Sequence, residues 1–171
     1  MKKKLLLMSV IFLMTFSYGQ DGQKGFGFDL GYSTSRAAMA DIKYFINKNA
    51  FSLGFTYEFN DALGKKSKDI IPGTTAIGDG DYFFSVDIGY TRVLNERFSV
   101  SGEILIAQKK FYQNLSDNNF SEGAYHRIYK TTSTAGIGGI LTYNLTDLFG
   151  IFAGYNSLRE LDFGMQFKFL H

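Results

Sequence analysis

The 171-residue sequence contains no cysteine and a single proline, Pro72. Without cysteine the chain forms neither disulfide bonds nor thiolate metal sites, and it cannot be a lipoprotein that is acylated on cysteine. A helical period of useful length is also missing, as is any segment with the composition of a linker. These absences leave one domain that is not built from helices.

The first 19 residues have the composition of a secretory signal peptide. Three lysines at positions 2–4 precede an apolar run from Leu5 to Phe16, and small or polar residues follow. We place cleavage after Gly19, so that residues 20–171 form the mature barrel domain. The alternative is a membrane anchor, but about a dozen apolar residues fall short of the ~20 that a spanning helix needs.

Removing this leader changes the charge balance. The full sequence has 18 lysines and arginines against 16 aspartates and glutamates, and the leader holds three of the lysines. The mature chain is therefore close to neutral, and the basic character of the full chain belongs to the export signal. A near-neutral domain lacks the electrostatic footprint of a nucleic-acid-binding protein, so we expect no nucleic-acid partner.

Apolar and polar residues alternate with a period of two along the mature chain, which is typical of strands with two unlike faces. The sequence predicts eight strands, over residues 24–34, 38–47, 50–60, 81–93, 97–110, 128–145, 148–156 and 159–170. An even number of antiparallel strands places both termini at the same end of the sheet.

The connections between these strands alternate in length. Short connections at 47–49, 94–96 and 145–147 interleave with connections near 35 and at 61–80, 111–127 and 156–160, two of which are long. Bacterial outer-membrane barrels have this asymmetry, with short periplasmic turns and longer extracellular loops. We therefore expect periplasmic termini. The strand that starts at 128 is too long for one crossing, so part of it should project beyond the bilayer.

One face of the predicted strands carries most of the bulky side chains. Exposing them all to water would forfeit far more free energy than the roughly 5–15 kcal/mol that separates folded from unfolded proteins. A soluble barrel or a sandwich would bury this face inward, but an eight-stranded barrel is only just wide enough inside for side chains to fill. The sequence therefore predicts an all-β, eight-stranded antiparallel up-and-down transmembrane β-barrel, whose lipid-facing residues include Phe51, Leu53, Phe55, Tyr57, Phe59, Phe84, Ile88, Phe163, Phe167 and Phe169.

The opposite face of the strands is rich in glycine and carries the charged residues. Isolated charges in a narrow barrel interior would be very costly, so we expect them to pair or to stay hydrated. The simplest interpretation is an ion-pair network that fills the barrel, and the alternative is a path for protons or ions. The predicted members are Asp29, Asp41, Lys43, Glu58, Asp87, Glu103, Lys109, Lys130, Asp162 and Lys168.

Three stretches share one arrangement, namely a strand end, a polar turn and a next strand led by phenylalanine. They are FINKNAFSLGFTY, RVLNERFSVSGEI and YNLTDLFGIFAGY, and the last strand, LDFGMQFKFL, has alternating aromatic residues. On these residues the chain resembles small eight-stranded outer-membrane β-barrels of the OmpA/OmpX-like type, particularly the short barrels of Bacteroidetes. The resemblance implies recognition by the barrel-assembly machinery. The aromatic residue is usually terminal in that family, whereas Leu170 and His171 follow Phe169 here.

Catalytic residues, cofactors and metal sites are not expected. Family relatives that act on lipid A use a histidine with a serine and an acid, and the deacylase type has the serine two residues after its histidine. Ile128 takes that position after His126. The GDGD stretch at 78–81 lacks the remaining oxygen ligands of an EF-hand calcium loop.

The leading hypothesis is a monomeric, non-enzymatic barrel in the outer-membrane lipid. It would anchor two extracellular loops for surface interaction or envelope integrity, with an extracellular partner that the sequence does not identify. The alternatives are a narrow pore or proton pathway through the charged interior and a lipid-modifying enzyme.

Overall fold

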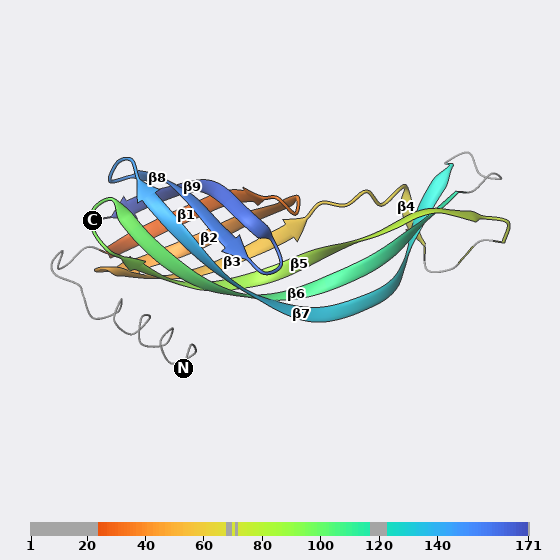
Figure 1. The fold of residues 1–171 in the computed structure, drawn as a ribbon, viewed down its shortest axis with the longest axis horizontal. Coiled ribbons are helices and arrows are strands. Elements are labelled where there is room, and N and C mark those ends of the chain that lie inside the picture. The colour runs from red at the N-terminus through yellow and green to blue at the C-terminus, as the bar shows by residue number, and fades with distance from the viewer. Residues whose placement is uncertain (1–23, 68–69, 71, 117–122, 171) are drawn as a thin grey trace, which may run out of the picture.

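The computed structural model of the chain describes residues 24–67, 70, 72–116 and 123–170 (Figure 1). The leader predicted at residues 1–19 and the C-terminal His171 lie outside the described residues. Within the described part, no helix is long and apolar enough to cross a membrane.

Nine strands in the described part of the chain form one sheet. They are β1 (Lys24–Ser33), β2 (Ala37–Ile46), β3 (Asn49–Glu58), β4 (Lys65–Ser67), β5 (Thr75–Val93), β6 (Phe98–Ser116), β7 (Ala124–Asn144), β8 (Phe149–Asn156) and β9 (Glu160–Leu170). Their order is β4-β7-β6-β5-β3-β2-β1-β9-β8, and β7 also pairs with β8, which closes eight antiparallel strands into a ring. The predicted eight-stranded antiparallel barrel is confirmed.

Three strands continue well past the rest of the barrel. β5 and β6 have 19 residues each and β7 has 21, whereas β8 has eight. We call the part beyond the barrel the extension; it consists of residues 59–67, 72–82, 109–116 and 124–132. Figure 1 shows it projecting from the end opposite the C-terminus.

The extension corrects the predicted loops at 61–80 and 111–127. The structure places residues 75–80, 111–116 and 124–127 in strands β5, β6 and β7, and residues 65–67 in β4. The prediction failed there because these segments belong neither to the apolar outer wall nor to the barrel interior, so no alternation of apolar residues marks them. The predicted projection of the strand from 128 agrees with the structure, since β7 pairs with β8 only over Gly138–Asn144.

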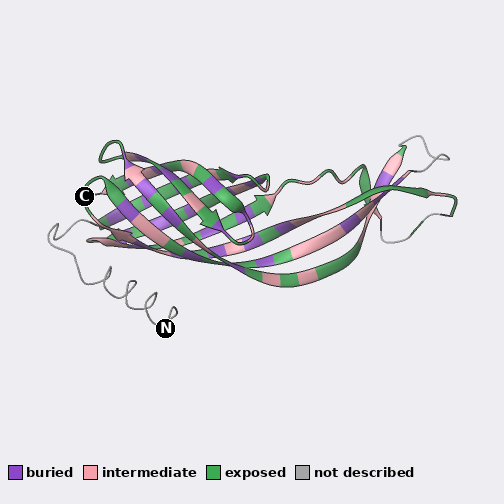
Figure 2. Cartoon of the chain, viewed as in Figure 1, coloured by how far each residue is buried: buried purple, intermediate pink, exposed green. Residues whose placement is uncertain are grey.

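Exposed and buried residues alternate along each barrel strand (Figure 2). Most of the predicted lipid-facing side chains are exposed on the outer wall, for example Phe51 at 59% and Ile88 at 55%. Phe59 lies just past the end of β3 and packs against Tyr57. Phe167 is only half-exposed because Phe149 packs against it.

Eight aromatic residues, one on each barrel strand, line the outer wall near the short turns. They form four directly opposed cross-strand pairs whose ring centroids lie 5.0 to 5.5 Å apart: Phe26–Tyr44, Phe51–Tyr90, Phe98–Tyr143 and Phe149–Phe167. Aromatic girdles of this kind mark the membrane interface of outer-membrane barrels. The outer wall therefore has the apolar band and the aromatic border of a membrane-spanning surface.

Side chains fill the interior of the barrel. Met39, Ile140 and Phe152 form one buried apolar cluster, and Ala37, Phe83 and Ala107 form another. Inward glycines make room for these side chains, as Gly31 does. A Cβ atom at Gly31 would lie 2.8 Å from Phe152 Cζ and 2.9 Å from Met39 Cγ.

We predict that Gly31→Ala destabilises the barrel by about 1–3 kcal/mol through overpacking. Urea unfolding in detergent micelles measures the change. Gly102→Ala is the control, because a Cβ atom there has nothing within 4 Å. Equal unfolding midpoints for the two variants would contradict a filled interior.

Candidate functional site

Arg159 is the central cation of the barrel interior, although it does not lie on a strand. It belongs to the turn between β8 and β9, and the next residue, Glu160, adopts a φ of 65°. This turn folds inward, so that Leu158 packs against the cluster of Ala37, Phe83 and Ala107. The Arg159 side chain is completely buried.

Arg159 binds three carboxylates from three strands. Its Nη1 donates to Asp87 Oδ2 at 3.0 Å and to Thr56 Oγ1 at 2.9 Å. Its Nη2 pairs with Glu103 Oε1, and with Asp162 Oδ2 at 3.1 Å. We call this group of side chains the Arg159 network.

Neutral side chains complete the Arg159 network. The Ser85 hydroxyl donates to Asp87, and Asn156 Nδ2 donates to Glu103 Oε1 at 2.7 Å. Such hydrogen bonds offset part of the cost of burying these charges. These contacts tie β3, β5, β6, β8 and β9 together across the interior.

A second ion pair joins β1 and β2. Lys43 Nζ lies 2.6 Å from Asp29 Oδ2, and Gln166 Nε2 donates to Asp29 Oδ1 at 3.0 Å. Asp41 is directly opposite Asp29 in the β1–β2 register and is also buried. Among the described residues, no lysine or arginine nitrogen lies within 4.0 Å of the Asp41 carboxylate.

Lys168 is buried near the end of the barrel that carries the short turns. It borders a hollow of about 290 Å³. Asn144 and Asp147 also line this hollow. Lys168 therefore lies at the mouth of the interior and not in the Arg159 network.

The structure brings together most of the predicted interior charges but leaves three apart. Glu58 is half-buried at the far end of β3. Lys109 forms an ion pair with Asp81 at 2.5 Å, and both are partly exposed. Lys130 is exposed, and its Nζ lies 5.3 Å from the centre of the Phe111 ring.

Lys109 and Lys130 are thus corrected from interior to extension residues. Alternation of apolar and polar residues shows toward which side of a strand a side chain points, but not at which residue the strand leaves the closed barrel. Both lysines lie on the inward side of β6 or β7 where those strands have already left the ring. An extra residue in β7, between the partners of Phe111 and Tyr112, also shifts the register there.

The prediction missed Arg159 because it began the last strand at residue 159, where alternation places Arg159 on the same outward side as Leu161. In the structure residue 159 lies in a turn instead. One signal was available: the predicted inward set held more acids than lysines, and correcting Lys109 and Lys130 widens that excess. An unassigned arginine in a short turn was therefore a candidate for the missing cation.

His126 lies in the extension. Its Nδ1 is 3.0 Å from the Leu63 carbonyl oxygen, and its ring packs edge-on against Tyr112. Both contacts are structural. Within the described residues, no group of three or more histidines and acids is arranged to hold a metal ion.

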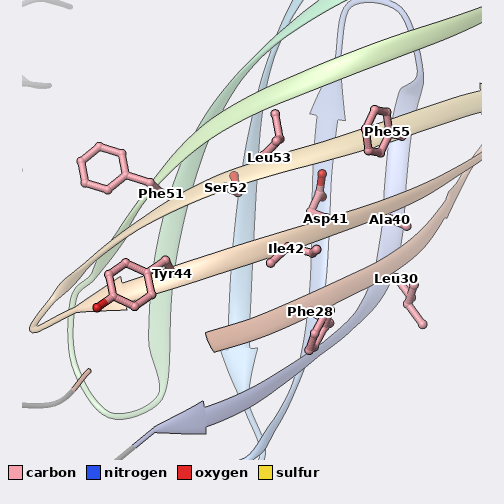
Figure 3. Close-up of a pocket in the computed structure, with 10 residues that line it drawn as sticks. All are labelled: Phe28, Leu30, Ala40, Asp41, Ile42, Tyr44, Phe51, Ser52, Leu53 and Phe55. Carbon is pink, nitrogen blue, oxygen red and sulfur yellow. The ribbon is translucent and has the colours of Figure 1, made fainter. Parts of the chain in front are cut away.

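The outer wall has a groove where β1, β2 and β3 lie side by side (Figure 3). Its volume is about 540 Å³. Ala40 creates the depression because its register partners on either side are Leu30 and Phe55. The lining is almost entirely apolar, so we call it the Ala40 groove; it is lined by Phe28, Leu30, Ala40, Asp41, Ile42, Tyr44, Phe51, Ser52, Leu53 and Phe55.

No family model and no curated protein sequence matches the chain. Among solved structures, the fold is similar to the N-terminal β-barrel domain of Pseudomonas aeruginosa OprF, with a TM-score of 0.50 and 14% identity over 87% of this chain and 98% of that one. A second similar structure is Ail, the attachment invasion locus protein of Yersinia pestis, with a TM-score of 0.48 and 16% identity over 87% of this chain and 96% of that one. A third is Neisserial surface protein A, with a TM-score of 0.45 and 14% identity over 86% of this chain and 95% of that one.

The likeness to the OprF domain supports the fold that the strand pairing establishes, a small eight-stranded β-barrel. The narrower resemblance to Bacteroidetes barrels remains a prediction.

Proposed function

We propose that this chain is a non-enzymatic, monomeric protein of the bacterial outer membrane that holds its extension outside the cell as an interaction surface. The apolar outer wall and its aromatic border support the membrane location. The first residues of β1 and the last residues of β9 lie at the end of the barrel opposite the extension, which supports termini in the periplasm (Figure 1). Outer-membrane lipid and the barrel-assembly machinery are the partners that this proposal implies.

The proposal rests on the extension being an ordered, hydrogen-bonded structure. The Asn114 side chain accepts a hydrogen bond from Leu63 N at 2.9 Å and donates one to Asp61 O at 3.0 Å. Tyr112 Oη accepts from Asp61 N at 3.1 Å. Connections between strands usually need only a few residues, so an ordered sheet beyond the barrel is more than a connector.

The extension also has an available edge. β4 pairs in parallel with β7 at residues 125–127 and covers part of one edge of the extension. On the other edge, pairing between β3 and β5 ends at Tyr57 and Phe84, and no described strand pairs with that edge over residues 75–82. Such an edge can accept a strand from a partner. This favours surface interaction over a purely structural role in the envelope.

The packed interior does not favour the alternative of a pore. The inward turn between β8 and β9 places Leu158 and Arg159 across the barrel, with Phe83 and Phe152 buried alongside. The contacts of His126 likewise do not favour a lipid-modifying enzyme.

The test is to replace residues 60–80 and 112–129 with short turns while keeping the barrel. We expect the truncated protein to insert into the outer membrane and to keep the shift in gel mobility on heating that intact barrels show. We expect cells that produce the truncated protein to bind extracellular partners no better than cells that lack the protein. Unchanged binding and envelope phenotypes in an inserted truncation would contradict the proposal.

A further inference from the structure

The Ala40 groove is a depression in the outer wall of the barrel. Ala40 is the small residue in a row of register partners that reads Leu30, Ala40 and Phe55 across three strands. All three are exposed on the outer wall. Figure 3 shows the flanking side chains standing around the site of Ala40.

The end of the groove nearer the short turns meets the aromatic border. Tyr44 packs against Phe26 at 5.0 Å, and Phe51 packs against Tyr90 at 5.5 Å, as measured between ring centroids. The rest of the groove lies between this border and the extracellular end of the wall. Its position therefore corresponds to the hydrocarbon region of the bilayer if the proposed membrane location is correct.

The chemistry of the lining selects the occupant. Phe28, Leu30, Ile42, Leu53 and Phe55 offer apolar contact only. Of the lining residues that carry polar groups, Asp41 and Ser52 alternate toward the barrel interior, and Tyr44 lies at the aromatic border. A ligand that needs hydrogen bonds would therefore lose them here, whereas a hydrocarbon chain gains dispersion contacts with a concave surface on several sides.

A second copy of the chain is a poorer occupant. A stable protein interface buries roughly 1,200–2,000 Å² in total, and a single depression centred on one alanine supplies little of that area. The groove is instead continuous with the lipid-facing wall. From this geometry we infer that the Ala40 groove binds one acyl chain of an outer-membrane lipid, a binding site that rests on the proposed membrane location.

The experiment compares lipid retention by three full-length mature proteins inserted in phosphatidylcholine vesicles: the natural sequence, Ala40→Phe and Ala135→Phe. Phenylalanine at 40 fills the groove. Ala135 is the control, since it is an exposed alanine of β7, on the opposite side of the ring. After transfer to detergent, native mass spectrometry counts the lipid molecules that stay bound.

We expect the natural protein and Ala135→Phe to retain a lipid that Ala40→Phe loses. Equal retention by all three proteins would overturn the inference, and so would a dimer that only Ala40→Phe abolishes. Gel mobility before and after heating reports insertion separately. Inserted proteins with equal retention refute the acyl-chain site alone, whereas failure of the natural protein to insert refutes the membrane location and the site with it.

Discussion

Replacing Arg159 with alanine is expected to destabilise the barrel by about 3–5 kcal/mol, because it leaves buried carboxylates without their cation. Asp87, Glu103 and Asp162 all pair with this one guanidinium. A loss of this size is a large part of the stability of a typical domain. Urea unfolding in detergent micelles, followed by the mobility of unheated samples on gels, measures it.

Two variants separate the Arg159 network from a general effect of removing arginine. Arg159→Lys keeps the charge but lacks the planar fork that reaches three carboxylates, so we expect an intermediate loss. Arg36→Ala removes an arginine from another turn on the same side. Arg36 donates to Asp61 at 3.2 and 2.9 Å and so lowers the pKa of that carboxyl, but both side chains are exposed and we expect little change in stability. An Arg159→Ala protein as stable as Arg36→Ala would rule out a structural network.

Replacing Ile88 with lysine is expected to destabilise the barrel in lipid vesicles by about 2–4 kcal/mol, the cost of a cation in the middle of the hydrocarbon region. Ile88 is 55% exposed on the outer wall of β5, and its register partners are Leu53 and Ile104. In water the same replacement on an exposed surface would be nearly neutral. Urea unfolding from vesicles measures the difference.

Ile77 provides a matched control on the same strand. It is 52% exposed, nearly the same as Ile88, but it lies in the extension. We expect Ile77→Lys to change stability by no more than about 0.5 kcal/mol. Equal stability of the two lysine variants would mean that Ile88 faces water as Ile77 does, and would contradict a membrane around the barrel.

The barrel itself could be predicted from the sequence because an outer wall of bulky apolar residues and an inner wall of small or polar residues give a strong alternating pattern. Phe51, Leu53 and Phe55 alternate with small or polar residues, and each bulky residue faces outward as expected. The short turns that follow β2, β5 and β7 lie at residues 47–48, 94–97 and 145–148, within one or two residues of their predicted positions. Closure could be inferred because an open edge is not tolerated in hydrocarbon.

The Arg159 network could be predicted only in part. Asp87, Glu103 and Asp162 occupy inward positions of regular strands, so alternation found them. Arg159 lies in a turn, where no period applies, and its direction depends on how the turn folds over the interior. The pairing of a turn residue with three distant strands is a tertiary feature that local pattern does not encode.

The extension was missed for a related reason. In residues 75–80, TAIGDG, the only large apolar residue is Ile77, so neither face carries the alternation that marks a strand. The segment forms a strand because β6 pairs with it along its length, with one irregularity between Ala76 and Gly78. Pairing with a neighbour that is itself long, and not burial, specifies this part of the fold.

The most direct test of the lipid-facing wall uses the absence of cysteine in the chain. Leu53→Cys and Leu63→Cys each introduce one thiol for a fluorescent label, the first on the outer wall of β3 and the second in the extension. In vesicles that contain lipids brominated on their acyl chains, we expect strong quenching of the label at 53 and none at 63. No quenching at 53, or equal quenching at both positions, would contradict a barrel whose outer wall meets hydrocarbon.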